Sequence, residues 1–149
     1  MGGVGSNTEV DFVQVHNNSD DGIEMFGGTA DLKHVVLTGN DDDSLDTDNG
    51  WQGNAQYVVV IQRADGGDNM VEASSVAPGA VPASDATVSN FTFVNLGNTS
   101  GNGLRHNTGT IGTYANGVVL EPSDCLRYET TAGDGVSSFT AGDDPEYLS

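Results

Sequence analysis

The sequence contains very little positive charge. Its four cationic residues are Lys33, Arg63, Arg105 and Arg127, against 22 Asp and Glu residues, which gives a formal net charge of −18. Binding to phosphate groups depends on Lys and Arg, so we expect no nucleic-acid partner. An anionic membrane surface is disfavoured for the same reason. Divalent cations and neutral or cationic surfaces are the partners that this charge favours, although a soluble acidic surface would by itself explain it.

Three further absences narrow the class of protein. Cys125 is the only cysteine, which excludes an internal disulfide. No run approaches the roughly 18 apolar residues of a membrane-spanning helix, so no membrane insertion is predicted. The opening residues, MGGVGSNTEV, lack the basic and apolar regions of a signal peptide, and we expect them to begin a mature or excised segment. No segment has the spacing of apolar residues that is typical of an amphipathic helix.

A five-residue pattern recurs along the chain. DDGIE at 20–24 aligns with DDSLD at 42–46 and DNMVE at 68–72, and weaker copies follow as GNGLR at 101–105 and SDCLR at 123–127. The successive offsets are 22, 26, 33 and 22 residues. The fourth position is always aliphatic and the second is always Asp or Asn. Short runs rich in Val, Phe and Tyr precede the copies, so each repeat is predicted to contain about two short strands.

The repeat length predicts the fold. A unit of roughly 22 residues cannot bury its own apolar side chains, so it must pack against neighbouring units. With turns rich in Asn and Gly, this favours an all-β protein, a single-stranded right-handed parallel β-helix of about five to six turns, which we call rungs. Equivalent residues of successive rungs would lie about 4.8 Å apart. The aliphatic position then forms an interior column, and the Asp/Asn position forms a column that hydrogen-bonds the backbone at the turns.

The whole chain, 1–149, is predicted to form a single β-helix domain. Residues 73–87, ASSVAPGAVPASDAT, are predicted to be an inserted loop, which is either a tolerated surface insertion or a wall of a binding groove. Residues 130–149 are predicted to form a partial last rung, GDGVSSF, and a fraying tail. The opening shows no cap over the end of the solenoid, so we expect a fragment of a longer solenoid or ends that pair with another copy.

These repeats resemble the pectate-lyase-like right-handed β-helix superfamily. The stretch NNSDDGIEMFGGTADLKHVVLTGNDDDSLDTDNGWQG, residues 17–53, is similar to a segment of large secreted or lipid-anchored β-helix proteins of marine bacteria. The similarity covers about residues 1–130 and implies an extracellular or cell-surface location. Many members of the superfamily bind or cleave acidic polysaccharides, often with calcium and an Arg or Lys base, whereas others are adhesins or structural spikes. The fold alone does not choose between these activities.

The repeats also predict stacked carboxylates. The first position of the pattern stacks Asp20, Asp42 and Asp68, and the fifth stacks Glu24, Asp46 and Glu72. Like charges at the spacing of neighbouring strands repel, and a hard cation such as Ca²⁺ would relieve that repulsion. The alternative is a solvated acidic face with raised pKa values. The predicted metal ligands are Asp20, Glu24, Asp42, Asp46, Asp48, Asp68 and Glu72.

Two other features are candidates for chemistry. Arg105 and Arg127 replace the acid at the fifth position in the last two repeats, so we expect Arg105 to lie near Glu72. Arg105 is then either a base or anion clamp, with Asp46 and Glu72 as the other catalytic candidates, or a salt bridge that fixes the order of the rungs. Trp51 follows DTDNG at a turn, where an exposed indole would stack on a sugar ring. The alternative is that Trp51 covers the apolar core.

The sequence therefore predicts an extracellular or cell-surface binding or structural module that divalent cations stabilise. Its partners would be a polysaccharide, a cell surface or other copies of itself. The alternative is a carbohydrate-active enzyme, of the polysaccharide lyase or glycoside hydrolase type, that acts on an extracellular polysaccharide. Such an enzyme should have a groove where the 73–87 loop overhangs the acidic column and Arg105.

Overall fold

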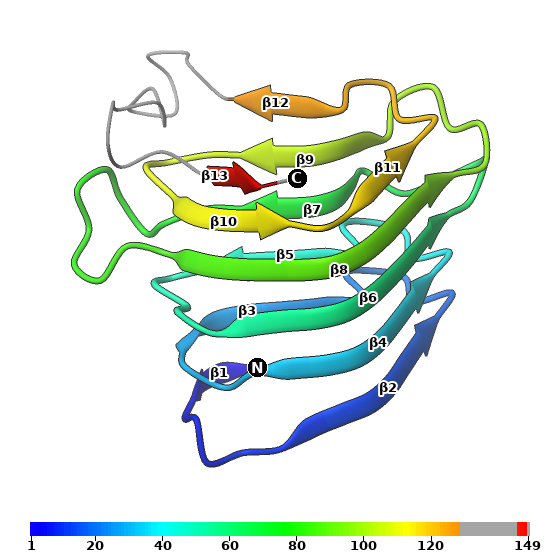
Figure 1. Ribbon diagram of the computed structural model, residues 1–149. Helices are drawn as coiled ribbons and strands as arrows, with labels where there is room; N and C mark the ends of the chain where they lie inside the picture. Colours follow the sequence, from blue (N-terminus) through cyan, green and yellow to red (C-terminus); the bar gives the residue numbers. More distant parts are fainter. Residues whose placement is uncertain (129–145, 149) are drawn as a thin grey trace.

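The computed structural model describes residues 1–128 and 146–148, and within these residues every regular element is a β-strand. None of the described residues belongs to a helix that is long and apolar enough to cross a membrane. The strands of one sheet cross the front of the molecule and the chain returns behind through the other sheet, while it climbs from rung to rung (Figure 1). This path is right-handed, as predicted.

Two parallel sheets form the walls of the solenoid, and each rung contributes one segment to each sheet. Sheet A stacks β1 (Gly2–Val4), β3 (Ile23–Gly28), β5 (Leu45–Asp48), β7 (Asn69–Ala73), β9 (Asn102–His106) and β12 (Leu126–Tyr128). Sheet B stacks β2 (Val10–His16), β4 (Leu32–Thr38), β6 (Asn54–Gln62), β8 (Asp85–Asn95), β10 (Ile111–Ala115) and β13 (Glu146–Leu148), and β11 (Val118–Leu120) also pairs with β8.

The register of the strands is the one that the repeat predicted. In sheet A, Ile23 pairs with Leu45, Leu45 with Val71, Val71 with Leu104 and Leu104 with Leu126. The first four of these side chains are buried and form the interior column, whereas Leu126 is 38% exposed on the last rung of sheet A. The fold prediction of an all-β parallel β-helix is therefore confirmed, with about five complete rungs among the described residues.

Sheet B supplies the rest of the core. Its inward rows pair Val35 with Val58 and Leu37 with Val60, and the same rows continue to Phe91 and Phe93 in β8. In β4, β6, β8 and β10, buried positions alternate with more exposed ones along most of the strand. A single rung has no interior of its own. Each inward side chain is therefore buried by the equivalent residues of the rungs above and below it and by sheet A across the core.

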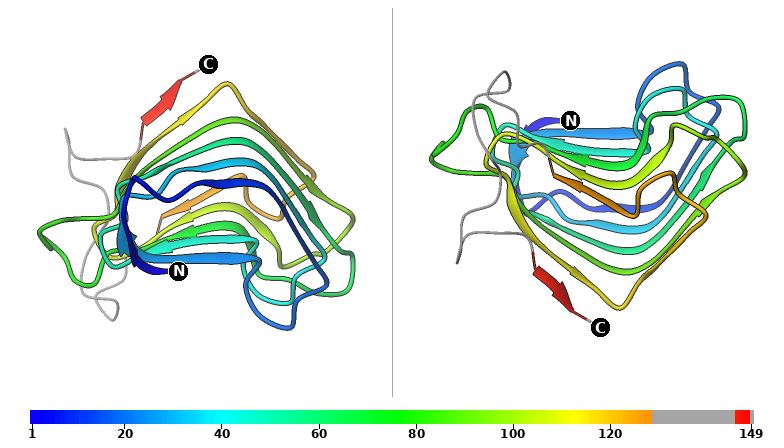
Figure 2. Two further views of the ribbon diagram at one scale, coloured as in Figure 1. Left: turned by 90° about the horizontal axis from the view of Figure 1, so that it is seen from below. Right: turned by 90° about the horizontal axis from the view of Figure 1, so that it is seen from above.

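The strands of sheet B bend part way along their length (Figure 2). At the equivalent position of each of five rungs one residue has left-handed backbone angles, with φ between 51° and 59°: Phe12, His34, Tyr57, Asn90 and Asn116. Asn tolerates this conformation, whereas bulky side chains rarely adopt it. The three aromatic rings stack, with centroids 4.5 Å apart for Phe12–His34 and 5.0 Å apart for His34–Tyr57. This stacking offsets part of the backbone cost.

The predicted inserted loop is shorter than the sequence suggested, because Ala73 ends β7 and residues 85–87 already belong to β8. Residues 74–84 protrude beyond the ends of the neighbouring strands, at the left of Figure 1. The predicted partial rung GDGVSSF lies outside the described residues.

Candidate functional site

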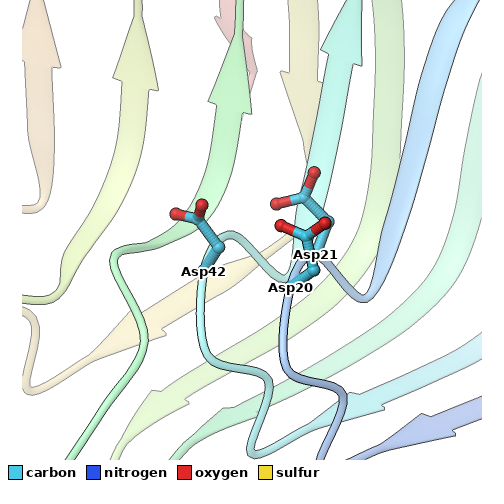
Figure 3. A group of neighbouring side chains, drawn as sticks. All are labelled: Asp20, Asp21 and Asp42. Atoms are coloured by element: carbon cyan, nitrogen blue, oxygen red, sulfur yellow. The ribbon is translucent and has the colours of Figure 1, made fainter.

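The turns that precede β3, β5 and β7, together with the first residues of β3 and β5, bring seven carboxylates together. Their oxygen atoms lie within 4.8 Å of one another in three groups: Asp20–Asp21–Asp42, Asp21–Glu24–Asp46 and Asp42–Asp43–Asp68. In the first group the three side chains project to the same side of two neighbouring turns (Figure 3). Because Asp21 and Asp42 each belong to two groups, the seven residues form one continuous patch, which we call the acidic cluster.

The second position of the repeat holds these turns in register through a column of hydrogen bonds. Asp21 Oδ1 accepts a bond of 3.0 Å from the backbone N–H of Asp43. Asp43 Oδ1 in turn accepts bonds from the backbone and side-chain N–H groups of Asn69, at 2.8 and 2.7 Å. The side chain of Asn102 then donates to Asn69 Oδ1 at 2.8 Å. The predicted Asp/Asn turn column is confirmed, and it draws Asp43 to 4% exposure.

Burial and crowding raise the pKa values of four of these carboxyl groups. Burial is the largest cause in each case, because it penalises the charged form. It raises the pKa of Asp46 to about 8, with further increases from the charges of Glu72 and Asp21. It raises the pKa of Asp43 to about 9, assisted by a hydrogen bond to Glu72. The pKa of Asp21 rises to about 6, although the N–H of Asp43 opposes the shift. The pKa of Asp42 is also raised by burial and by Asp68 and Asp20.

Arg105 borders the acidic cluster on its upper side. Its guanidinium Nη1 lies 3.3 Å from Glu72 Oε2 and 3.7 Å from Asp68 Oδ2. Glu72 also accepts hydrogen bonds from the side chains of Asn69 and Asn107. The prediction that Arg105 lies near Glu72 is confirmed. Glu72 is thus held by donors from Asn69, Asn107 and Arg105, and it also adjoins Asp43 and Asp46, whose pKa values it raises.

The structure brings five of the predicted metal ligands into the acidic cluster: Asp20, Glu24, Asp42, Asp46 and Asp68. Asp48 and Glu72 lie outside the three groups, and Asp48 Oδ1 accepts the backbone N–H of Asn49 at 2.6 Å. Asp21 and Asp43 belong to the cluster although the sequence assigned them only to the turn column. The signal that could have found them is their place directly after the first acid of each repeat.

The donor set of the acidic cluster fits a hard divalent cation. All seven side chains offer carboxylate oxygen, which Ca²⁺ prefers. Asp46 Oδ1 is buried and accepts no hydrogen bond from another described side chain or backbone group. A cation next to Asp21, Glu24 and Asp46 would satisfy that oxygen and reduce the repulsion that raises the pKa values. A bound proton is the other way to reduce the same repulsion.

Trp51 corrects a prediction. The expectation of an exposed indole that stacks on a sugar ring is wrong, because Trp51 is 0% exposed. Its Nε1–H donates to the backbone carbonyl of Ala30 at 3.1 Å, and its ring belongs to the apolar core. The wide apolar surface of the indole favours this burial once its single polar atom has a partner. Trp51 therefore covers the core, as the alternative interpretation held.

The groove expected of an enzyme is not formed by the predicted elements. The loop 74–84 is fixed to the turns that follow the sheet A strands: Ser84 Oγ accepts the N–H of Gly50, and Ser75 Oγ donates to the carbonyl of Gly109. Asp20, Asp42 and Asp68 lie in the turns that precede those strands. The loop and this side of the acidic cluster are thus at opposite ends of sheet A. A cavity of about 580 Å³ lies elsewhere, and its lining comprises Asn95, Leu96, Gly97, Asn98, Thr99, Glu121, Pro122 and Ser123.

The geometry defines a class of protein, a right-handed parallel β-solenoid with acidic turns. The profile of the pectate-lyase like beta helix domain matches residues 1–143, so the chain belongs to this family. No curated protein and no solved structure matches the chain. The family membership confirms the resemblance to pectate-lyase-like β-helices that the repeats indicated, and it does not distinguish a binding module from an enzyme.

Proposed function

We propose that this β-helix is an extracellular binding or structural module in which the acidic cluster holds a divalent cation such as Ca²⁺. The observation that carries the proposal is the crowding of seven carboxylates into three overlapping groups with oxygens within 4.8 Å. The raised pKa values of Asp21, Asp42 and Asp46 support it, because burial and then the neighbouring carboxylates make the charged forms costly, and a cation would offset that cost.

The same cluster connects stability to binding. A cation in any of the three groups would join two successive rungs, which otherwise contact each other through the sheets, the core and the hydrogen bonds of the turns. It would also leave an exposed metal ion beside Asp20 and Asp42, where hydroxyl or carboxylate groups of a glycan or a cell surface could complete its coordination. We therefore propose polysaccharides, cell surfaces and other copies of the chain as partners.

A thermal melt with and without Ca²⁺ tests the cation. Protein freed of metal with EDTA should gain several degrees in Tm at millimolar Ca²⁺, because a ligand that binds only the folded state stabilises it. Asp42→Asn should remove most of this gain, since Asp42 belongs to two of the three groups. Asp85→Asn is the matched control, because Asp85 is an exposed acid at the start of β8. Equal Tm values with EDTA and with Ca²⁺ would contradict the proposal.

The alternative function is a carbohydrate-active enzyme of the lyase or hydrolase type, and one observation favours it. Arg105 is the candidate base, and its guanidinium lies beside the carboxylates of Glu72 and Asp68, which are candidate acids. Incubation with a panel of acidic and neutral polysaccharides, followed by measurement of new chain ends, tests this function. Cleavage that is lost in Arg105→Ala and retained in Arg63→Ala would establish the enzyme, because Arg63 pairs with Asp41 and Asp65, whereas Arg105 pairs with Glu72 and Asp68.

A further inference from the structure

Part of the outer face of sheet B differs from the rest of the surface in its charge. Two rows of outward residues follow the bend, one per strand, and their members pair in register. One row comprises Gln14, Val36, Val59, Thr92 and Val118, and the other comprises His16, Thr38, Ile61, Val94 and Leu120. We call these ten residues the neutral face. None of them is Asp, Glu, Lys or Arg, in a chain with 22 acids.

The neutral face is apolar at its centre and upper part. Val59, Val118 and Leu120 are 36%, 44% and 45% exposed. The run Tyr57–Ile61 in β6 is continuously apolar, whereas a strand with one solvated face alternates between apolar and polar residues. Parallel strands with continuous apolar runs are usually covered on both faces. Exposed apolar patches of this kind mark sites of association.

From this face we infer that the chain forms a symmetric dimer through the outer side of sheet B, with a second copy of itself as the occupant. The net charge restricts where two copies can meet. Two copies that each carry −18 repel wherever carboxylates meet, and the neutral face is a broad region of the described surface where they can meet without that cost. This inference specifies the self-association in the proposed function, but it uses a face other than the acidic cluster.

The register of the strands allows a two-fold arrangement. A two-fold axis along β6 would place the first rung of one copy against the fifth rung of its partner. Val59 and Ile61 would then meet their own equivalents at the centre of the interface. The stacked rings of Phe12, His34 and Tyr57 form a ridge beside the neutral face on rungs one to three, and on rungs four and five the equivalent positions carry the smaller Asn90 and Asn116. The rings of Phe12 and His34 in each copy would thus face the smaller Asn side chains on rungs four and five of the other copy.

The size of the face predicts a weak dimer. Along the solenoid axis, five strands about 4.8 Å apart span roughly 24 Å. Along the strands, the two rows and the ridge span roughly 20 Å, so the flat area is about 480 Å². A standard interface buries about 800 Å² on each partner. We therefore expect a dissociation constant on the order of 10–100 µM, and a tighter dimer at higher salt because salt screens the net charge.

Sedimentation velocity at about 5 to 500 µM protein, in EDTA and at two NaCl concentrations, tests the dimer. EDTA removes cation-bridged association, so this result does not depend on the proposed cation site. The wild type should shift from monomer to dimer, and Val59→Asp should abolish the shift by placing two carboxylates at the two-fold axis. Val76→Asp is the matched control, because Val76 is 69% exposed on the 74–84 loop. Circular dichroism verifies folding, and Val118→Asp or Val59→Thr replaces Val59→Asp if that variant does not fold.

Cross-linking provides a second readout. In a Cys125→Ser background, Val59→Cys should form a disulfide-linked dimer on oxidation, and Val76→Cys should not. A wild type that stays monomeric at 500 µM overturns the proposal. So does a Val76→Asp variant that is weakened as much as Val59→Asp. Retention of a monomeric wild type on insoluble neutral cellulose, lost in Val59→Asp, would assign the face to a glycan and overturn the dimer.

Discussion

Single carboxyl groups decide how the stability of this solenoid depends on pH. Asp43 is nearly inaccessible and bonds to Asn69, and Asp46 keeps one buried oxygen that no described protein donor reaches. Both acids have a pKa far above the ordinary 3.8, at about 9 and about 8. The folded protein therefore holds protons near neutral pH that the unfolded chain releases.

The direction of the pH dependence follows from these values. Carboxyls with a raised pKa in the folded state contribute fully below about pH 4, and their contribution is lost as the pH rises through about 8 to 9. In EDTA, the Tm should fall between pH 5 and pH 9. Asp43→Asn should flatten this dependence, because an amide reproduces the neutral, protonated carboxyl and extends the Asn69–Asn102 column. A Tm that rises over this range would contradict the assignment.

Trp51 carries a prediction about the core. Trp51→Phe removes the hydrogen bond to the Ala30 carbonyl and leaves a void beside buried residues. We expect a loss of about 2 kcal/mol in the free energy of unfolding, within the range for reduced core side chains. Urea denaturation measures it. Any binding to polysaccharides should stay unchanged in the folded variant, because the indole is buried and a ligand in solvent cannot reach it.

At the scale of elements, the 74–84 loop has a fixed base and an exposed tip. Gly50 has φ of 82°, and a Cβ there would lie 2.8 Å from the carbonyl oxygen of Pro82, so the loop packs closely onto the preceding turn. Ser84 is fully buried and bonds to Gly50 and Ser75. The tip, in contrast, carries Val76 and Val81, of which Val81 is 97% exposed. The loop thus joins the rungs at its base and leaves its tip in solvent.

This division predicts two different outcomes of mutation. Replacing residues 77–81 by a short Gly-Ser linker should change the Tm by no more than a few degrees, since few contacts are lost. Ser84→Ala should cost about 1–2 kcal/mol, because it removes the buried hydroxyl that accepts the N–H of Gly50 and leaves that donor without its partner. Thermal denaturation of both variants compares them. A larger loss on shortening the tip than on Ser84→Ala would show that the tip itself is structural.

At the scale of the whole molecule, the solenoid is a stack in which each rung contacts only its neighbours. Sheet B begins at β2, which pairs only with β4 among the described strands, whereas β6 lies between β4 and β8. Val10, Val13 and Val15 in β2 are only partly buried against the core. Stability in such stacks is close to a sum of rung and interface contributions, so it need not be uniform along the axis.

Hydrogen exchange should therefore follow position along the solenoid. We expect the slowest amide exchange in β6 and β8 and the fastest in β2, with intermediate rates in β4. Mass spectrometry of exchanged peptides measures this order at a protein concentration of about 1 µM, which is below the range expected for the dimer. Uniform protection across these four strands would show that the described rungs unfold as one cooperative unit.

Much of this architecture follows from the sequence. The recurrence of an aliphatic residue and an Asp or Asn at fixed places fixed the register, because parallel strands that repeat one pattern stack like on like. The sheet A columns, the Asp/Asn turn column and the proximity of Arg105 to Glu72 were all predictable for this reason. The repeat also predicted five of the seven members of the acidic cluster.

Other features required the tertiary structure, because they depend on distances and burial across rungs rather than on the repeat. The sequence alone determined which residues are equivalent. Only the packed structure decided that Trp51 turns inward, that Asp21 and Asp43 lie close enough to join the carboxylate groups, and that the loop and the acidic turns lie at opposite ends of sheet A. A period along the chain specifies stacking, whereas the direction of a side chain at a turn is set by the space and hydrogen-bond partners that its neighbours leave.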